Sequence, residues 1–234
     1  MGVSKYTLKE MIKINVIILC GGDGTRLGKL GEKKPKALVK IGEKTILDHQ
    51  IDFLRRYPYI DTIFLAAGYK SEMIEKHLLK KKIEGIVVVK EKKKLGTAGA
   101  IRNVLKKHKV SEEFIAFNVD DLVDLDLNRF IKKNPTIAVA HPLAEFGIVK
   151  LQYSGNASGR WIPLKGFKEK GPLSCYVSIG WYFLNTKITF PEIGMLETDV
   201  FPGLAEKGDL TAFRHQGRWK PVNTQKDIEE LEKK

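Results

Sequence analysis

The chain has 234 residues, and 43% of them are hydrophobic, so it can bury the core of one globular domain. Its longest apolar runs, such as residues 16–20, are too short to cross a bilayer, and its N-terminus does not resemble a secretory signal. Cys20 and Cys175 are the only cysteines, which excludes a disulfide framework and a structural zinc site and indicates a reducing cytoplasm.

The net charge is +13, because 41 basic residues outnumber 28 acidic ones. Such a charge is typical of proteins that bind nucleic acids or small anionic substrates. However, 33 of the basic residues are Lys and only eight are Arg. The Lys runs at 80–82 and 92–94 also lack interleaved aromatic residues that could stack on bases. We therefore expect a solvated, Lys-rich surface and no nucleic-acid partner.

Strand-like and helix-like patterns alternate along the first half of the chain. Near-continuous apolar runs predict buried strands, and apolar residues at helical spacing predict the helices between them. The strands are expected at residues 15–20, 62–67, 86–90 and 114–118, and the helices at residues 46–57, 71–82 and 98–107. Ser71 and Thr97 are expected to cap the second and third helices. This order predicts an α/β fold with a mostly parallel central sheet.

The pattern changes after Asp120. Strand-like segments then follow one another with little helix between them, which suggests an antiparallel extension that carries a second substrate. These strands are expected at residues 136–141, 147–153, 161–168 and 174–184, followed by a helix at 199–207, a strand at 211–214 and a helix at 224–233. Since no repeat or interdomain linker is visible, we expect one domain over 1–234, divided into parts at 14–120 and 121–234.

A glycine-rich turn follows the first strand directly, with the sequence LCGGDGTRL at residues 19–27. At the carboxyl end of a parallel strand, such a turn is where nucleotides bind, because glycines let backbone N–H groups approach phosphate oxygens. The segment does not match a Walker A loop, and Leu27 stands at the third glycine of a Rossmann fingerprint. It is predicted to face phosphate without being of either type; a purely structural loop is the alternative.

Two cations lie close to this turn in the sequence. Arg26 belongs to it, and Lys36 follows ten residues later, directly after Pro35. Arg and Lys beside a glycine-rich loop can neutralise a triphosphate, and Pro35 fixes the backbone that aims Lys36. We therefore expect the part at 14–120 to bind a nucleotide.

With five further motifs, these residues resemble the signature of the sugar-1-phosphate nucleotidylyltransferases, from residue 14 through nearly the whole chain. The motifs are the loop at 21–27 with Pro35 and Lys36, LGTAGA at 95–100, FNVD at 117–120, FG at 146–147, FKEK at 167–170 and IGWY at 179–182. They are most similar to those of mannose-1-phosphate and heptose-1-phosphate guanylyltransferases. The resemblance implies a three-layer, Rossmann-like fold of the GT-A type, in which the part at 121–234 binds the sugar phosphate.

The resemblance also implies a reaction. An oxygen of a sugar-1-phosphate attacks the α-phosphorus of a nucleoside triphosphate, and pyrophosphate leaves. Because the nucleophile is already an anion near neutral pH, no general base is needed, and catalysis reduces to holding two polyanions together. Cations and Mg²⁺ suit this task. We therefore expect Mg²⁺ as cofactor and these two substrates as partners, with no membrane partner and with a small homodimer as the plausible assembly.

The resemblance assigns roles to the matching positions of this chain. Arg26, Lys36 and Asp120 are the expected catalytic residues. The nucleotide is expected at Gly21, Gly22, Gly24, Thr25, Glu91, Gly96 and Thr97, the sugar phosphate at Gly147, Glu169, Lys170 and Ser178, and the metal at Asp120 and Asn223. For Asp120 the alternative is a solvated acidic turn, although an Asp at the carboxyl end of a buried strand is well placed to hold a metal.

Three positions depart from the family pattern. Val119 stands where the family usually has Gly and could narrow the metal loop. Ser178 stands where an Asn often contacts the sugar. Asn223 stands where the second metal ligand is commonly an Asp, and an amide is a weaker ligand than a carboxylate, so metal binding should depend mainly on Asp120. Alternatively, Asn223 only caps the last helix.

Glu91, five residues before Gly96, favours GTP as the donor. A carboxylate only accepts hydrogen bonds, and it complements the N1–H and the amino group of guanine. Alternatively, Glu91 is one charge in a Lys-rich exposed loop. Two alternative functions are a cytidylyl- or uridylyltransferase acting on another sugar- or polyol-phosphate, and a catalytically weak relative that senses a nucleotide sugar.

Overall fold

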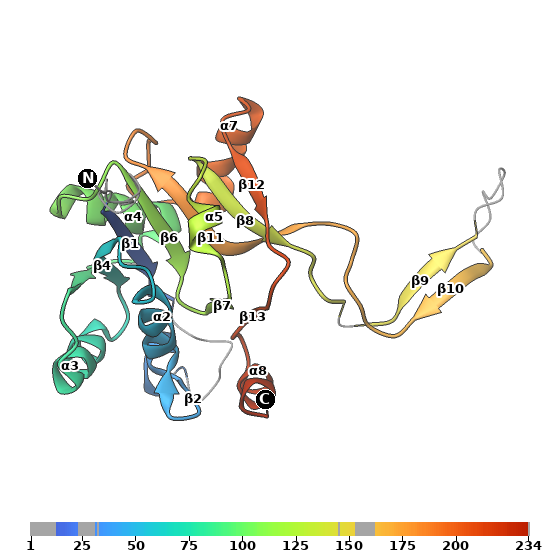
Figure 1. The fold of residues 1–234 in the computed structure, drawn as a ribbon, viewed down its shortest axis with the longest axis horizontal. Helices are drawn as coiled ribbons and strands as arrows, with labels where there is room; N and C mark the ends of the chain where they lie inside the picture. Colours follow the sequence, from blue (N-terminus) through green and yellow to red (C-terminus); the bar gives the residue numbers. More distant parts are fainter. Residues whose placement is uncertain (1–12, 23–30, 32, 145, 153–161, 234) are drawn as a thin grey trace, which may run out of the picture.

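The computed structural model describes residues 13–22, 31, 33–144, 146–152 and 162–233. Its centre is a seven-stranded sheet with the order β12-β8-β11-β6-β1-β4-β5 (Figure 1). The strands are β1 (Ile14–Leu19), β4 (Ile60–Ala67), β5 (Ile86–Lys90), β6 (Glu113–Asn118), β8 (Thr136–Ala140), β11 (Val177–Asn185) and β12 (Thr211–Arg214). Of these seven strands, only β11 runs antiparallel to its neighbours. The predicted α/β fold with a mostly parallel sheet is confirmed.

Helices cover both faces of this sheet, which gives three layers. They are α2 (Ile46–Leu54), α3 (Ser71–Lys81), α4 (Gly96–Lys107), α5 (Leu127–Phe130), α6 (Leu196–Asp199), α7 (Phe201–Glu206) and α8 (Gln225–Glu232). Val16 and Ile18 of β1 pack into one core with α2, α3 and α8, whereas Ile17 and Leu19 pack into the other with α4, α6 and α7. Because alternate residues enter opposite cores, the apolar run of β1 is continuous.

The predicted helices begin within two residues of their expected starts, but the two expected caps are wrong. α3 begins after Lys70, which is in the left-handed conformation (φ 52°), and Ser71 is its first residue. α4 begins after Leu95, so Thr97 lies inside the first turn. The Thr97 hydroxyl accepts a hydrogen bond from the backbone N of Leu196 (2.7 Å). A tertiary contact has therefore replaced the local cap.

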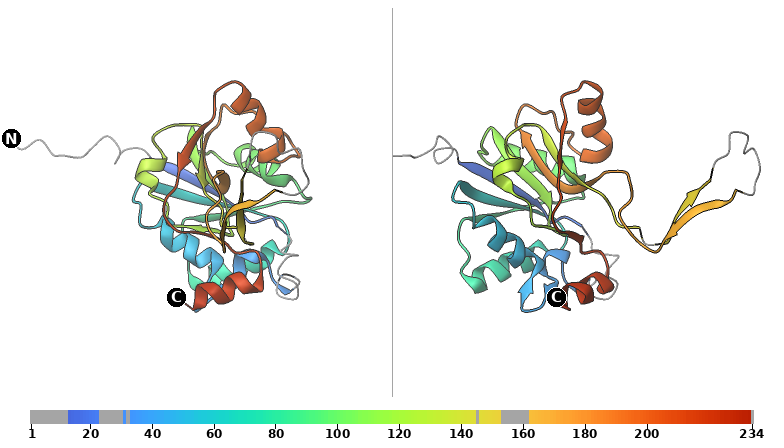
Figure 2. Two further views of the ribbon diagram at one scale, coloured as in Figure 1. Left: turned by 90° about the vertical axis from the view of Figure 1, so that its right-hand side faces the viewer. Right: turned by 45° about the vertical axis from the view of Figure 1, so that its right-hand side comes forward.

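The second half of the chain divides its strands between the central sheet and smaller antiparallel pairs. β8 and β11 lie in the central sheet, as does β12. The small pairs are β9 (Ile148–Leu151) with β10 (Leu164–Lys168), β7 (Asp121–Val123) with β13 (Trp219–Pro221), and β2 (Lys40–Ile41) with β3 (Lys44–Thr45). The β9–β10 hairpin projects away from the body in Figures 1 and 2.

Two further observations concern the helices. The helix expected at 199–207 is divided at Val200 into α6 and α7, and Pro202 occupies the first turn of α7, where proline is tolerated. None of the helices in the described ranges is long and apolar enough to span a bilayer.

Candidate active site

Lys36, Asp120 and Asn223 meet at the carboxyl end of β6, although they are far apart in the sequence. The Lys36 Nζ forms an ion pair with Asp120 Oδ2 and donates a hydrogen bond to Asn223 Oδ1 (3.0 Å). Asp120 lies between β6 and β7, and the pairing of β7 with β13 brings Asn223 beside it. The backbone N of Val222 also donates to the carbonyl of Asp120 (2.9 Å). The structure thus brings these three predicted site residues together, while their roles stay predictions.

Lys36 is aimed by its surroundings. Pro35, in an extended conformation, directly precedes the short 3-10 helix η3 (Lys36–Leu38). The buried side chains of Ala37 and Leu38 anchor the backbone of this helix. The side chains of Lys36 and Asp120 are 14% and 24% exposed, respectively. An ion pair in such partial burial is screened by water less than a surface pair. The positive charge of Lys36 is therefore fixed in position at the carboxyl end of β6.

The oxygens of Asp120 and Asn223 converge on one cation, which here is the Lys36 ammonium. Mg²⁺ is commonly held by one or two carboxylates together with phosphate oxygens and water, so this donor set fits it. No cluster of three or more His, Cys, Asp or Glu that could hold a metal is present among the described residues. An Mg²⁺ ion at this place would therefore depend on Asp120, Asn223 and oxygens of the substrates.

Asn223 does not cap the last helix. The cap of α8 is Thr224, which forms a capping box with Asp227. Asp227 also accepts a hydrogen bond from the backbone N of Asn223 (3.0 Å), and Lys220 pairs with Asp227 (2.7 Å). The capping interpretation of Asn223 is wrong, and its side-chain oxygen is free to face Lys36.

The backbone on both sides of Asp120 is held by Gln50, which the sequence analysis did not identify. The Gln50 Nε2 donates to the carbonyl oxygens of Val119 (3.0 Å) and Asp121 (3.1 Å). The indole Nε1 of Trp181 donates to the same Asp121 carbonyl (3.1 Å). Gln50 is a polar residue on the buried face of α2, and this was the available sequence signal.

The side chain of Asp121 makes further hydrogen bonds next to Asp120. It accepts hydrogen bonds from Trp219 Nε1 (3.0 Å) and Asn118 Nδ2 (3.2 Å). Burial, together with the charge of Asp120, raises the pKa of Asp121 to about 6. Gly180, at φ +73°, leaves the space for this carboxylate, because a Cβ there would overlap it. The glycine of the IGWY motif is therefore explained by the space that the Asp121 carboxylate needs.

Glu91 also lies at the carboxyl ends of the parallel strands, beside Gly21. It follows β5, and its Oε1 would lie 3.3 Å from a Cβ at Gly21, two residues after the end of β1. The carboxylate accepts a backbone hydrogen bond from Leu95, but its Oε1 is buried without a partner among the described residues. Burial raises the pKa of Glu91. Buried polar atoms are rarely left unpaired, so this oxygen is suited to a donor on a ligand.

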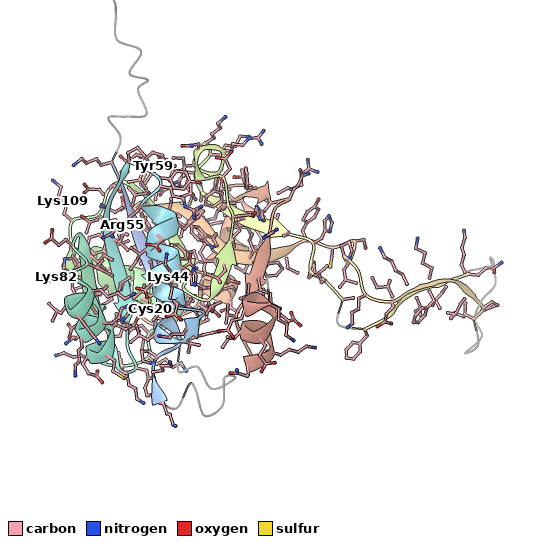
Figure 3. The ribbon with its side chains drawn as sticks, turned by 60° about the horizontal axis from the view of Figure 1, so that its bottom comes forward. Cys20, Lys44, Arg55, Tyr59, Lys82 and Lys109 are labelled. Atoms are coloured by element: carbon pink, nitrogen blue, oxygen red, sulfur yellow. The ribbon has the colours of Figure 1, made fainter. Side chains whose placement is uncertain are left out.

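Cys20 is the residue directly after β1. It is buried between β1 and the glycine-rich loop, and burial together with the charges of Asp120 and Glu91 raises the pKa of its thiol. Figure 3 shows it inside the body. Since a buried thiol with a raised pKa is a poor nucleophile, Cys20 is a packing residue.

The predicted residues at the start of α4 contact another part of the protein. Thr97 donates to Glu197 (3.1 Å) besides accepting from Leu196. A Cβ at Gly96 would overlap the carbonyl of Gly194. Thr97 thus holds the first turn of α6, and Gly96 packs against the segment before it; their nucleotide-binding role stays a prediction. A Cβ at Gly22 would meet no atom of the described residues within 4 Å, whereas Gly24, Thr25 and Arg26 lie outside the described residues.

The predicted sugar-phosphate residues lie at and beyond the β9–β10 hairpin. Glu169 and Lys170 are exposed directly after β10, and Lys170 is left-handed (φ 54°). The ring of Phe167 covers the position where a Cβ of Gly147 would lie. Ser178, in β11, is exposed. Within the described ranges, none of the four forms a hydrogen bond or ion pair with the cluster of Lys36, Asp120 and Asn223, so their assignment stays a prediction.

Comparisons with known proteins identify the family of the chain. The family model described as nucleotidyl transferase matches residues 15–234. A Xenopus laevis protein named mannose-1-phosphate guanyltransferase beta-B is 32% identical over 235 residues, covering 92% of this chain and 62% of that protein. A Bacillus subtilis protein named probable glucose-1-phosphate cytidylyltransferase is 28% identical over 246 residues, covering 94% of this chain and 95% of that protein.

The fold is shared with solved structures as well. The crystal structure of HddC from Yersinia pseudotuberculosis matches with a TM-score of 0.71 and 25% identity, covering 94% of this chain and 98% of that chain. The chain spans 53% of a GlmU relative from Methanococcus maripaludis and 62% of the Xenopus protein, so it corresponds to only part of several relatives. The resemblance read from the motifs is confirmed, and the chain belongs to the nucleotidyl transferase family.

Proposed function

We propose that this protein transfers a nucleotidyl group from a nucleoside triphosphate, with GTP favoured, to a sugar-1-phosphate. The observation that carries the proposal is the convergence of Lys36, Asp120 and Asn223 at the carboxyl end of the sheet. Ligands of open α/β sheets bind at this edge, and phosphoryl transfer needs positioned charge there. The names of the relatives support the same class of reaction.

The reaction forms a bond between the sugar-phosphate oxygen and the α-phosphorus, and it breaks the bond from that phosphorus to the pyrophosphate. The attacking oxygen carries its negative charge already, so the protein does not have to remove a proton. Lys36 would neutralise phosphate charge, while Asp120 and Asn223 would hold Mg²⁺. A bound Mg²⁺ would supply further charge neutralisation and orient the phosphate oxygens. Arg26 is proposed to assist from the glycine-rich loop.

GTP is favoured because of Glu91. Its buried Oε1 has no partner among the described residues, and guanine offers two adjacent donors, N1–H and the amino group. Uracil offers only one ring donor and cytosine only its amino group, so each would satisfy a carboxylate less well. The names of the relatives include both a guanyltransferase and a cytidylyltransferase, so a cytidylyl or uridylyl donor is the second candidate.

A cytoplasmic location and a homodimer belong to the proposal. Cytoplasm would keep Cys20 and Cys175 reduced and would supply the nucleoside triphosphate.

The test is pyrophosphate release by the purified chain with Mg²⁺, across all nucleoside triphosphates crossed with a panel of sugar-1-phosphates. We expect turnover with GTP and one sugar-1-phosphate, and loss of turnover in Lys36→Ala. The matched control is Lys44→Ala, since Lys44 is an exposed lysine that pairs with Asp52 on the surface. Turnover with CTP or UTP alone would refute the interpretation of Glu91. No turnover with any pair, while nucleotides still bind, would favour a sensing relative.

A further inference from the structure

The ammonium of Lys36 lies between the side-chain oxygens of Asp120 and Asn223. It forms an ion pair with Asp120 Oδ2 and donates a hydrogen bond to Asn223 Oδ1 (3.0 Å). The carboxylate and the amide oxygen are also the donors that this part of the chain offers to Mg²⁺. One pair of oxygens is therefore available to two different cations, the ammonium of the chain itself and a metal ion.

The two cations compete for these oxygens. Mg²⁺ binds oxygen lone pairs at about 2.1 Å, and an ammonium donates its hydrogen bonds to the same lone pairs. A metal ion beside the bound ammonium would also be repelled by it, and this repulsion is stronger where water is partly excluded. The side chains of Lys36 and Asp120 are both largely buried. Metal binding is therefore opposed as long as the ammonium stays.

The ammonium can leave while the oxygens stay in place. Lys36 carries its charge on a flexible four-carbon stem, and the buried side chains of Ala37 and Leu38 hold its backbone. A change of side-chain rotamer is thus enough to move the charge. Asp120 is held on both sides, because Gln50 donates hydrogen bonds to the carbonyls of the residues before and after it. In this site the carboxylate is fixed and the lysine is movable.

We propose that Lys36 takes the place of the metal in the free chain: its ammonium neutralises Asp120, and Mg²⁺ binds to Asp120 and Asn223 only by displacing it. The phosphate oxygens of a nucleotide would then be the next partner of the ammonium, so that metal and nucleotide favour each other's binding. This last step rests on the proposed function, whereas the displacement of Lys36 by a metal ion is testable without any substrate.

The proposal has a consequence that separates it from other roles of Lys36. Removal of the ammonium should tighten metal binding by the free chain, although the same change should abolish turnover. If Lys36 instead helped to position the metal ligands, its removal would weaken metal binding. If its ion pair only stabilised the fold, its removal would leave metal binding unchanged.

The first experiment measures Mn²⁺ binding to the purified full chain without nucleotide, from the electron paramagnetic resonance signal of free Mn²⁺. Mn²⁺ is the probe because carboxylate and carbonyl oxygens suit it as they suit Mg²⁺. We expect Lys36→Met to bind Mn²⁺ at least about 10-fold more tightly than the wild-type chain. The matched control is Lys44→Met, which removes an equal charge from an exposed lysine paired with Asp52 and should bind Mn²⁺ as the wild-type chain does. Adding Asp120→Asn to Lys36→Met should abolish the gain.

The proposal is overturned if Lys36→Met binds Mn²⁺ no more tightly than Lys44→Met, or if the gain survives Asp120→Asn. Thermal unfolding in EDTA verifies that each variant is folded. A second measurement uses the wild-type chain alone, with acetylation of its lysines followed by mass spectrometry of the peptides. Saturating Mn²⁺ should speed the acetylation of Lys36, because the displaced amine loses its ion pair, and should leave that of Lys44 unchanged. Equal rates for Lys36 with and without Mn²⁺ would also contradict the displacement.

Discussion

Gln50 offers a sharp test of how the site is built. Its amide donates to the carbonyls of Val119 and Asp121, so it fixes the backbone on both sides of Asp120. The side chain is 2% exposed, and water cannot replace it easily. Gln50→Leu keeps a similar volume but removes both donors. Each lost hydrogen bond to a buried carbonyl costs about 1 kcal/mol, so we expect the free energy of unfolding to fall by about 1–3 kcal/mol.

The loss of these two hydrogen bonds should also lower the rate of the reaction. Displacing a catalytic group by about 1 Å can reduce turnover by about 100-fold. We therefore expect Gln50→Leu to raise the Mg²⁺ concentration needed for half-maximal pyrophosphate release and to lower turnover by at least about 10-fold. Urea unfolding measures the stability, and a Mg²⁺ titration of the reaction measures the effect on the site.

The control is Ile51→Val, on the same helix and also buried. It should cost about 0.5–1.5 kcal/mol of stability and leave the Mg²⁺ requirement unchanged, because it removes packing without touching the backbone of the site. If Gln50→Leu loses stability but has the same Mg²⁺ requirement as Ile51→Val, then Gln50 supports the fold only, and its positioning role is refuted.

Three further predictions address other parts of the structure. Glu91→Gln should weaken the preference for GTP over CTP and UTP by about 10-fold or more in kcat/KM, because Gln presents a donor where guanine also has one; an unchanged preference would remove Glu91 from base selection. Gly180→Ala should lower the melting temperature and turnover, since its Cβ would overlap the Asp121 carboxylate at φ +73°, and a melting temperature equal to that of wild type would contradict this. Although burial raises the pKa of Asp48, hydrogen bonds from Lys81 and His77 hold it well below its usual range. The ionised carboxylate stabilises the fold above the unfolded pKa near 4, and this stabilisation is lost as the pH falls through the lower folded pKa. Lowering the pH should therefore reduce the free energy of unfolding of Asp48→Asn by less than that of the wild-type chain; equal reductions would refute the assignment.

The sequence predicted the fold well where local pattern decides it. β1, β4 and β6 are short apolar runs because alternate residues of each pack into the two cores on opposite faces of the sheet, whereas β5, at the end of the sheet, is only partly buried. The caps at Ser71 and Thr97 were predicted wrongly, since the structure gives the Thr97 hydroxyl a tertiary partner and turns the chain at Lys70. Propensity describes only local competition, and tertiary contacts can override it.

The site was predictable only in part. The motifs identified Lys36, Asp120 and Asn223, and the structure brings these three together. Gln50 was missed because helical periodicity predicts a buried face but does not show what a single polar residue on that face contacts. The pairing of β7 with β13 was missed as well, because it joins two three-residue strands about a hundred positions apart, and such short strands have no periodicity to detect.

The most direct test of the account is a Mg²⁺ titration of pyrophosphate release by the wild-type chain and by Asp120→Asn, with the preferred substrate pair. The control is Asp124→Asn, because Asp124 is exposed nearby and pairs with His215 instead of Lys36. The account predicts that Asp120→Asn loses most turnover and needs much more Mg²⁺, while Asp124→Asn behaves as wild type. If the Asp120→Asn titration coincides with that of the wild-type chain, then the cluster of Lys36, Asp120 and Asn223 is not the catalytic centre.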